Sequence, residues 1–96
     1  MVDFDRNALA RVCEENDVLR LRIFGSVARG EERPDSDLDV IVDFEKPKGL
    51  LALIRLERRL EEFFGRPVDL VTEPGLSPYI RKAVLDSASV IFDAAA

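Results

Sequence analysis

Two aspartates, Asp37 and Asp39, stand two positions apart at the start of an apolar run in the segment GSVARGEERPDSDLDVIVDF, residues 25–44. On a β-strand such residues share a face and lie roughly 6.6 Å apart along the chain. Carboxylate oxygens are the ligands that Mg²⁺ and Mn²⁺ prefer, so this pair can hold one or two cations. A third acid, Asp69, interrupts the apolar stretch PVDLVT, residues 67–72, where strand propensity disfavours aspartate. If the two strands are neighbours, the three carboxylates form a metal site suited to phosphoryl chemistry.

Residues that suit phosphate binding precede these carboxylates. Gly25 and Ser26 follow an alternating apolar stretch and begin a segment that can form a short helix. Glycine lets the backbone approach a ligand closely, and the start of a helix offers free N–H groups to phosphate. The Ser26 hydroxyl adds a donor, and Arg29 either reaches a phosphate or holds the loop through an acid such as Asp35. Together with the carboxylates, these residues predict a site for a metal-bound nucleoside triphosphate.

Other acids in the same segment have simpler interpretations. Asp35 is typical of a turn, and Asp43 lies about 13 Å further along the strand than Asp39, which suits a solvated strand end. An EF-hand loop beginning at Asp35 is excluded, because Val40 stands where glycine is needed and Lys46 where glutamate is needed.

The composition narrows the chemistry further. The chain has 96 residues, of which 47% are hydrophobic and 34% charged, a balance that predicts one globular domain over residues 1–96. It has no histidine, which excludes serine–histidine and cysteine–histidine catalysis and removes the usual zinc ligand. The single cysteine, Cys13, falls on the apolar face of a helical pattern, which indicates a reduced and buried thiol.

The charge and the hydrophobic pattern also bear on partners. A net charge of −5 argues against a surface that coats nucleic acid, so no direct nucleic-acid contact is expected. No apolar run approaches the roughly 20 residues of a membrane span, and the sequence shows no signal peptide. We therefore expect a cytoplasmic protein with no membrane contact.

These side chains are positioned by a short series of elements. The apolar spacing predicts, in order, a helix over 6–16, a strand over 18–24, a short helix over 26–30, a strand over 37–44, a helix over 50–64, a strand over 67–72, a helix within 77–88 and a last strand over 89–93. In the first strand, the alternation is expected to place Leu19, Leu21 and Ile23 on one side. This order predicts an α/β (α+β) fold: a small mixed sheet with helices on one face. The other face stays open for Asp37 and Asp39.

The quoted segment also resembles a known family. Gly25-Ser26, ten intervening residues and then Asp37-Leu38-Asp39 are similar to the signature of the DNA polymerase beta-like nucleotidyltransferase superfamily. The fuller string GSVARGEERPDSDLDVIV closely resembles the minimal nucleotidyltransferase (MNT) domains. Those domains are often the antitoxin halves of HEPN–MNT toxin–antitoxin pairs.

The resemblance implies a role for each matching residue. Gly25 and Ser26 would bind the triphosphate, Asp37 and Asp39 would hold Mg²⁺, and Asp69 would be the third carboxylate, assisting the acceptor hydroxyl. Family members transfer a nucleoside monophosphate and release pyrophosphate. Antitoxin-type members place AMP from ATP on a tyrosine of the HEPN toxin, a helical ribonuclease, and so silence it. Because the chain lacks a second domain to grip the acceptor, the resemblance also implies that a partner chain completes the site as a hetero-oligomer.

Two alternatives remain open on the sequence. The chain could transfer a nucleotide to a small molecule, with a helical partner subunit supplying the pocket. It could also be a non-catalytic antitoxin that neutralises its toxin by binding alone. The number of metal ions, the base preference and the role of Arg29 are left open by the residues.

Overall fold

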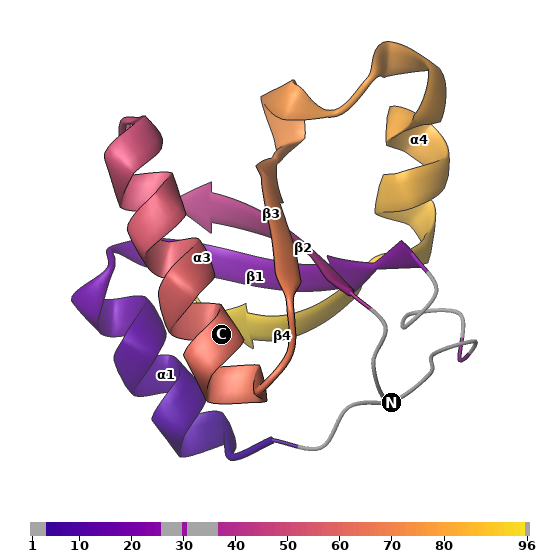
Figure 1. Ribbon diagram of the computed structural model, residues 1–96. Helices are drawn as coiled ribbons and strands as arrows, with labels where there is room; N and C mark the ends of the chain where they lie inside the picture. The colour runs from indigo at the N-terminus through magenta and orange to yellow at the C-terminus, as the bar shows by residue number, and fades with distance from the viewer. Residues whose placement is uncertain (1–3, 26–29, 31–36, 96) are drawn as a thin grey trace.

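The structure is a computed structural model, and it describes residues 4–25, 30 and 37–95 (Figure 1). Its elements follow the predicted order: α1 (Arg6–Glu15), β1 (Val18–Phe24), β2 (Leu38–Phe44), α3 (Leu50–Phe64), β3 (Val68–Thr72), the 3-10 turn η1 (Glu73–Gly75), α4 (Pro78–Ser87) and β4 (Ser89–Asp93). The short helix expected over 26–30 falls almost wholly outside the described residues.

The four strands form one mixed sheet in the order β3-β2-β1-β4. β1 is antiparallel to both β2 and β4, whereas β2 and β3 run parallel. A parallel pair needs a long crossover connection, and α3 supplies it between β2 and β3. The predicted mixed sheet is therefore confirmed, and the two strands that carry the predicted carboxylates are neighbours.

The core lies between one face of this sheet and the helices α1 and α3, which cross that face side by side (Figure 1). Burial of the apolar stripes on these helices is what drives them onto the sheet. The fully buried side chains of the cluster include Leu9 and Cys13 of α1, Leu56 and Leu60 of α3, and Leu21, Ile23, Leu38, Val40 and Val42 of the sheet.

The prediction for Leu19 was wrong. β1 has a bulge against β2: Val18 pairs with Phe44 and Arg20 with Asp43, so two steps along β1 match one step along β2. An extra residue reverses the alternation of side chains on its strand. Val18 is therefore buried in the core, and Leu19 is 37% exposed.

The opposite face of the sheet, called here the second face, carries the alternate residues of each strand. It is covered in part, because Ile41 of β2 and Leu76, just after η1, are buried outside the main core cluster. α4 contacts β1, and η1 contacts β2. Ser77 caps α4 by accepting a hydrogen bond from the Tyr79 amide, and Pro78 occupies the first helical turn, as the sequence predicts.

Candidate active site

Asp39 and Asp69 lie side by side on the second face. They are register partners in the parallel β2–β3 pair, and neighbouring strands are about 4.8 Å apart. Their neighbours Val40 and Leu70 point the other way, into the core. Asp39 is half-buried and Asp69 is exposed. The structure thus brings together two of the three carboxylates that the sequence singles out.

Side chains of α3 hold β3 in this position. The backbone amide of Val68 donates to Oε2 of Glu61, and the amide of Leu70 donates to Oε2 of Glu57, each over 3.1 Å. These two amides flank Asp69 on an edge of the sheet, where no further strand of residues 4–25, 30 and 37–95 accepts their hydrogen bonds. The sequence analysis missed this contact; the signal was the spacing of Glu57 and Glu61, which places both on one face of the helix.

Asp37 precedes β2 and is exposed. Its side chain does not join the pair in a closed cluster: within residues 4–25, 30 and 37–95, no three acidic, histidine or cysteine side chains are grouped so as to hold a metal ion. The centre that the structure forms is therefore the Asp39–Asp69 pair, with Asp37 beside it in the sequence.

Gly25 abuts this pair directly. It follows Phe24, whose register partner in β2 is Asp39. Its φ of +75° lies in the left-handed region, which glycine adopts without steric cost. A Cβ atom added at Gly25 would overlap Oδ2 of Asp39 and lie 3.3 Å from its Cγ. The predicted phosphate turn and the predicted carboxylates therefore meet at one point. Ser26, Arg29 and Asp35 lie outside the described residues.

The donor set fits a divalent cation. Two carboxylates on adjacent strands supply hard oxygen ligands, and the space at Gly25 that a side chain would fill is taken by the Asp39 carboxylate itself. Asp39 and Asp69 are the residues that would hold such an ion, close to a backbone that can approach phosphate.

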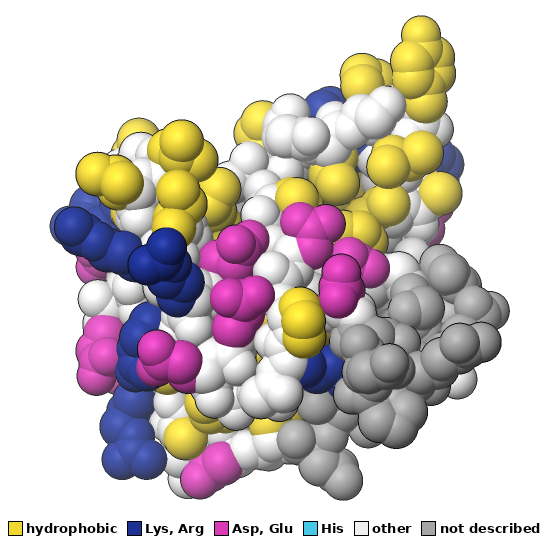
Figure 2. Space-filling view, viewed as in Figure 1, with side chains coloured by type: hydrophobic (Ala, Val, Ile, Leu, Met, Phe, Trp, Pro, Cys, Tyr) yellow, Lys and Arg dark blue, Asp and Glu magenta, His cyan; other side chains and the backbone are white. Residues whose placement is uncertain are grey.

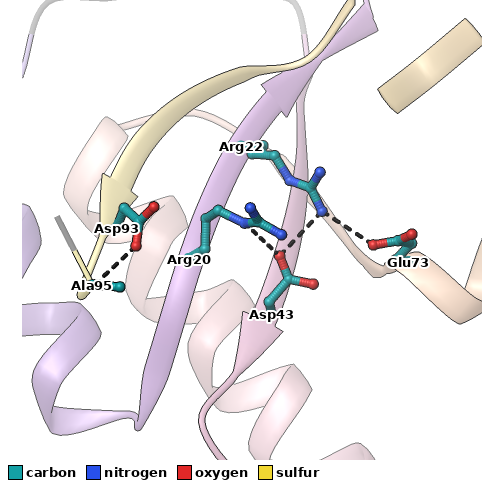
Figure 3. A network of polar contacts seen from close by, with 6 residues as sticks. All are labelled: Arg20, Arg22, Asp43, Glu73, Asp93 and Ala95. Carbon is teal, nitrogen blue, oxygen red and sulfur yellow. Dashed lines mark hydrogen bonds and ion pairs between the residues drawn. The ribbon is translucent and has the colours of Figure 1, made fainter. Parts of the chain in front are cut away.

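Asp43 has a different environment from the one expected. It is not a solvated strand end: its carboxylate accepts hydrogen bonds from Nε of Arg20 and from an Nη of Arg22, both at 3.1 Å (Figure 3). Arg22, whose side chain is only 11% exposed, also pairs with Glu73 of η1 at 3.4 Å. Because two arginines neutralise Asp43, this acid belongs to a structural network. The signal in the sequence was the Arg20-x-Arg22 alternation, which faces the same side as Asp43.

Comparison with known proteins decides the family. Residues 6–91 match the family model of the nucleotidyltransferase domain. The chain belongs to this family. The resemblance drawn from the sequence is thereby confirmed, and so is the expectation that the chain is an enzyme of the nucleotidyltransferase type.

Individual relatives of this nucleotidyltransferase domain point the same way. The protein adenylyltransferase MntA of Thermococcus cleftensis is 47% identical over 68 residues, which are 71% of this chain and 69% of the relative. A solved structure named as a candidate minimal nucleotidyltransferase has 48% identity and a TM-score of 0.74, with 88% of this chain and 86% of that chain covered.

A more distant likeness concerns the fold alone. A structure of a tri-AMPylated HEPN toxin from Shewanella oneidensis in complex with an MNT antitoxin matches at a TM-score of 0.66 and 18% identity, over 94% of this chain and 71% of that chain. In the described part of the nucleotidyltransferase domain, no helix is both long enough and apolar enough to cross a membrane.

Proposed function

We propose that this nucleotidyltransferase domain is a Mg²⁺-dependent protein adenylyltransferase that moves AMP from ATP to a tyrosine of a HEPN ribonuclease toxin and acts as its antitoxin. The observation that carries the proposal is the packing of the Asp39 carboxylate against Gly25, with Asp69 alongside on the neighbouring strand. This arrangement joins a phosphate-binding turn to a pair of oxygen ligands.

Each predicted site residue has a role in the proposed transfer of AMP. Gly25 and Ser26, with Arg29, would bind the triphosphate. Asp39 and Asp69 would hold the cation, and Asp37, which precedes β2, would have to turn toward them to serve as the third ligand. A bound divalent cation supplies charge neutralisation on the phosphate oxygens and lowers the pKa of the acceptor hydroxyl. Asp69 accepts the proton of that hydroxyl as its oxygen bonds to the α-phosphorus. The bond from the α-phosphorus to its bridging oxygen breaks, and pyrophosphate leaves in line with the attacking oxygen.

Two observations support a protein as the acceptor. The Thermococcus relative is named a protein adenylyltransferase, and the Shewanella complex holds an AMPylated HEPN toxin together with an MNT antitoxin. The surface also offers apolar side chains for a partner to cover: Leu50 and Leu51 at the start of α3 are each 70% exposed, and Tyr79 at the start of α4 is 97% exposed. In Figure 2 hydrophobic side chains gather at the two upper corners, where these helices begin.

The experiment is a labelling assay. The chain is incubated with Mg²⁺, α-³²P-labelled ATP and a HEPN protein chosen as its candidate toxin, and the labelled residue is identified by mass spectrometry. We expect label on a tyrosine of the HEPN protein, and none with Asp39→Asn. Asp43→Asn is the matched control, because it removes an acid from the same face of the same strand and should retain the label.

The outcomes separate the alternatives. Equal labelling by Asp39→Asn would contradict the proposed chemistry. Toxin neutralisation by Asp39→Asn in cells, in the absence of label, would show that binding alone suffices. Transfer to small hydroxylated acceptors, without label on the HEPN protein, would replace the protein acceptor by a small molecule.

A further inference from the structure

A pocket lies on the second face of the sheet, further along β2 than the carboxylate pair. It has a volume of about 420 Å³ and is lined by Asp43, Glu73, Pro74 and Arg81. Asp43 shares its face of β2 with Asp39 and stands four residues further along the strand, a distance of about 13 Å. The pocket is therefore on the same face as the candidate active site but outside it.

The charges around this pocket do not cancel. Asp43 pairs with both Arg20 and Arg22. Glu73 pairs with Arg22 as well, so two acids and two arginines neutralise one another (Figure 3). Arg81 adds a further positive charge, and it has no ion pair among the side chains that the structure describes. The group as a whole carries a net charge of +1.

The guanidinium of Arg81 also has hydrogen-bonding capacity that is not used. One Nη of this half-buried side chain donates to the carbonyl of Leu76 at 3.0 Å, whereas its Nε is buried without a hydrogen-bond partner. The Nε of Arg22 is in the same state. A buried donor on a charged group that lacks an acceptor costs free energy, which a ligand with anionic oxygens can recover.

A carboxylate fits these requirements. It carries a single negative charge, which balances the net charge of the group, and its two oxygens match the paired donors of a guanidinium. Rotation of the Arg81 side chain toward a carboxylate in the pocket would give both Nε and an Nη an acceptor.

The source of the carboxylate follows from what the nucleotide can offer. The anionic groups of ATP are its phosphates, which the proposed function places at Gly25 and the cation, beside Asp39. The base and the ribose are uncharged and would leave Arg81 without a counter-charge. Resting on the proposed function, we propose that Arg81 binds an aspartate or glutamate side chain of the HEPN protein. A protein surface is wide enough to present this carboxylate at Arg81 and its tyrosine at Asp69 together.

The test measures the KM for the HEPN protein and the affinity for ATP separately. Arg81→Gln removes the charge at the pocket. Lys82→Gln is the matched control, because it removes an equal charge from the next residue of α4, which does not line the pocket. Hydrogen bonds between charged groups change an affinity by about tenfold to a hundredfold, so we expect the KM to rise by that factor in Arg81→Gln and to stay unchanged in Lys82→Gln. The kcat, and the ATP affinity measured by calorimetry with Mg²⁺, should not change in either variant.

A second variant guards against a purely structural effect, because Arg81 also bonds the Leu76 carbonyl. Arg81→Lys keeps the positive charge and should bring the KM back toward the wild-type value. Urea denaturation shows whether each variant is folded.

The outcomes keep this inference apart from the proposed function. Absence of label on the HEPN protein with the wild-type chain would overturn the proposed function, and the inference with it. Normal labelling by the wild-type chain, with an unchanged KM in Arg81→Gln, would overturn the docking role of Arg81 alone. Weaker ATP binding in Arg81→Gln would assign the pocket to the nucleotide and would also overturn the inference. A raised KM that Arg81→Lys does not lower would reduce Arg81 to a structural support of α4.

Discussion

The carboxylate of Asp39 occupies the space that a side chain at Gly25 would need. Gly25 also has a positive φ. An alanine at this position would therefore have a strained backbone, and its Cβ atom would clash with the Asp39 carboxylate. The residue at position 25 and the carboxylate on the next strand therefore constrain each other.

Gly25→Ala separates these two effects when it is compared with Gly65→Ala. Gly65 has a φ of +66° at the end of α3, but a Cβ atom there meets nothing within 4 Å. Both variants should lose about 1–2 kcal/mol of unfolding free energy through the left-handed backbone. Only Gly25→Ala should also lose nucleotide binding and AMP transfer, because it displaces Asp39. Urea denaturation and the labelling assay measure the two quantities; full activity of Gly25→Ala would refute the constraint.

Asp69→Asn tests the proton acceptor. Because Asp69 is exposed and on the edge strand, the change should leave the fold intact. Loss of a general base lowers the rate by roughly 10²–10⁴-fold, so we expect kcat to fall by that factor while ATP binding changes little. Single-turnover labelling and calorimetry give the two values. A fall in ATP affinity at unchanged kcat would instead make Asp69 a substrate-binding residue.

Asp43→Asn is expected to destabilise the fold without abolishing catalysis. The change removes a charge that accepts hydrogen bonds from Arg20 and Arg22, and it leaves the partly buried Arg22 with Glu73 alone. Hydrogen bonds to charged groups contribute about 1.5–3 kcal/mol, so the unfolding free energy should fall by about 2 kcal/mol. Lys82→Ala breaks the exposed Lys82–Asp86 pair and should have no measurable effect on the denaturation midpoint.

Cys13 should be protected in the folded state. Its burial, with a smaller contribution from the charge of Glu14, raises the pKa of the thiol to about 12. A thiol-specific reagent at pH 8 should therefore react only as the chain unfolds. Reaction of the native chain at the rate of a free thiol would contradict the buried placement.

The raised pKa of the Cys13 thiol also makes the free energy of unfolding depend on pH. The unfolded chain loses the thiol proton near pH 9 and the folded chain near pH 12, so between these values the folded state binds more protons. The contribution of Cys13 is present in full below about pH 9 and declines as the pH rises toward 12. Cys13→Ala should make the stability less steeply dependent on pH in this window, as measured by urea denaturation at several pH values.

Much of the fold followed from local patterns. The 3.6-residue stripe of α3, the alternation of β2 and the Ser77-Pro78 start of α4 each predicted the element that formed, because burial of one apolar face governs all three. The prediction for the side chain of Leu19 was wrong for a different reason. The bulge in β1 depends on how β1 pairs with β2, and no pattern within residues 18–24 records that pairing.

The candidate active site could be predicted from the sequence less completely than the fold. The placement of Asp39 beside Asp69 was expected if β2 and β3 were neighbours, and they are. Asp43 was misjudged because its partners, Arg20 and Arg22, come from β1, more than twenty positions away in the sequence. The contacts of Glu57 and Glu61 with β3 were also missed. Their spacing places both side chains on one face of α3, but the backbone amides that this face reaches depend on where β3 joins the sheet.

Glu57 and Glu61 also affect which edge of the sheet can pair with a strand of another chain. An edge strand with free amides invites pairing by a foreign strand, but at β3 the amides of Val68 and Leu70 are occupied from within. A polypeptide that extended this sheet by β-augmentation would therefore have to add along β4, the opposite margin. The margin beside Asp69 therefore offers neither of these two amides to an invading strand.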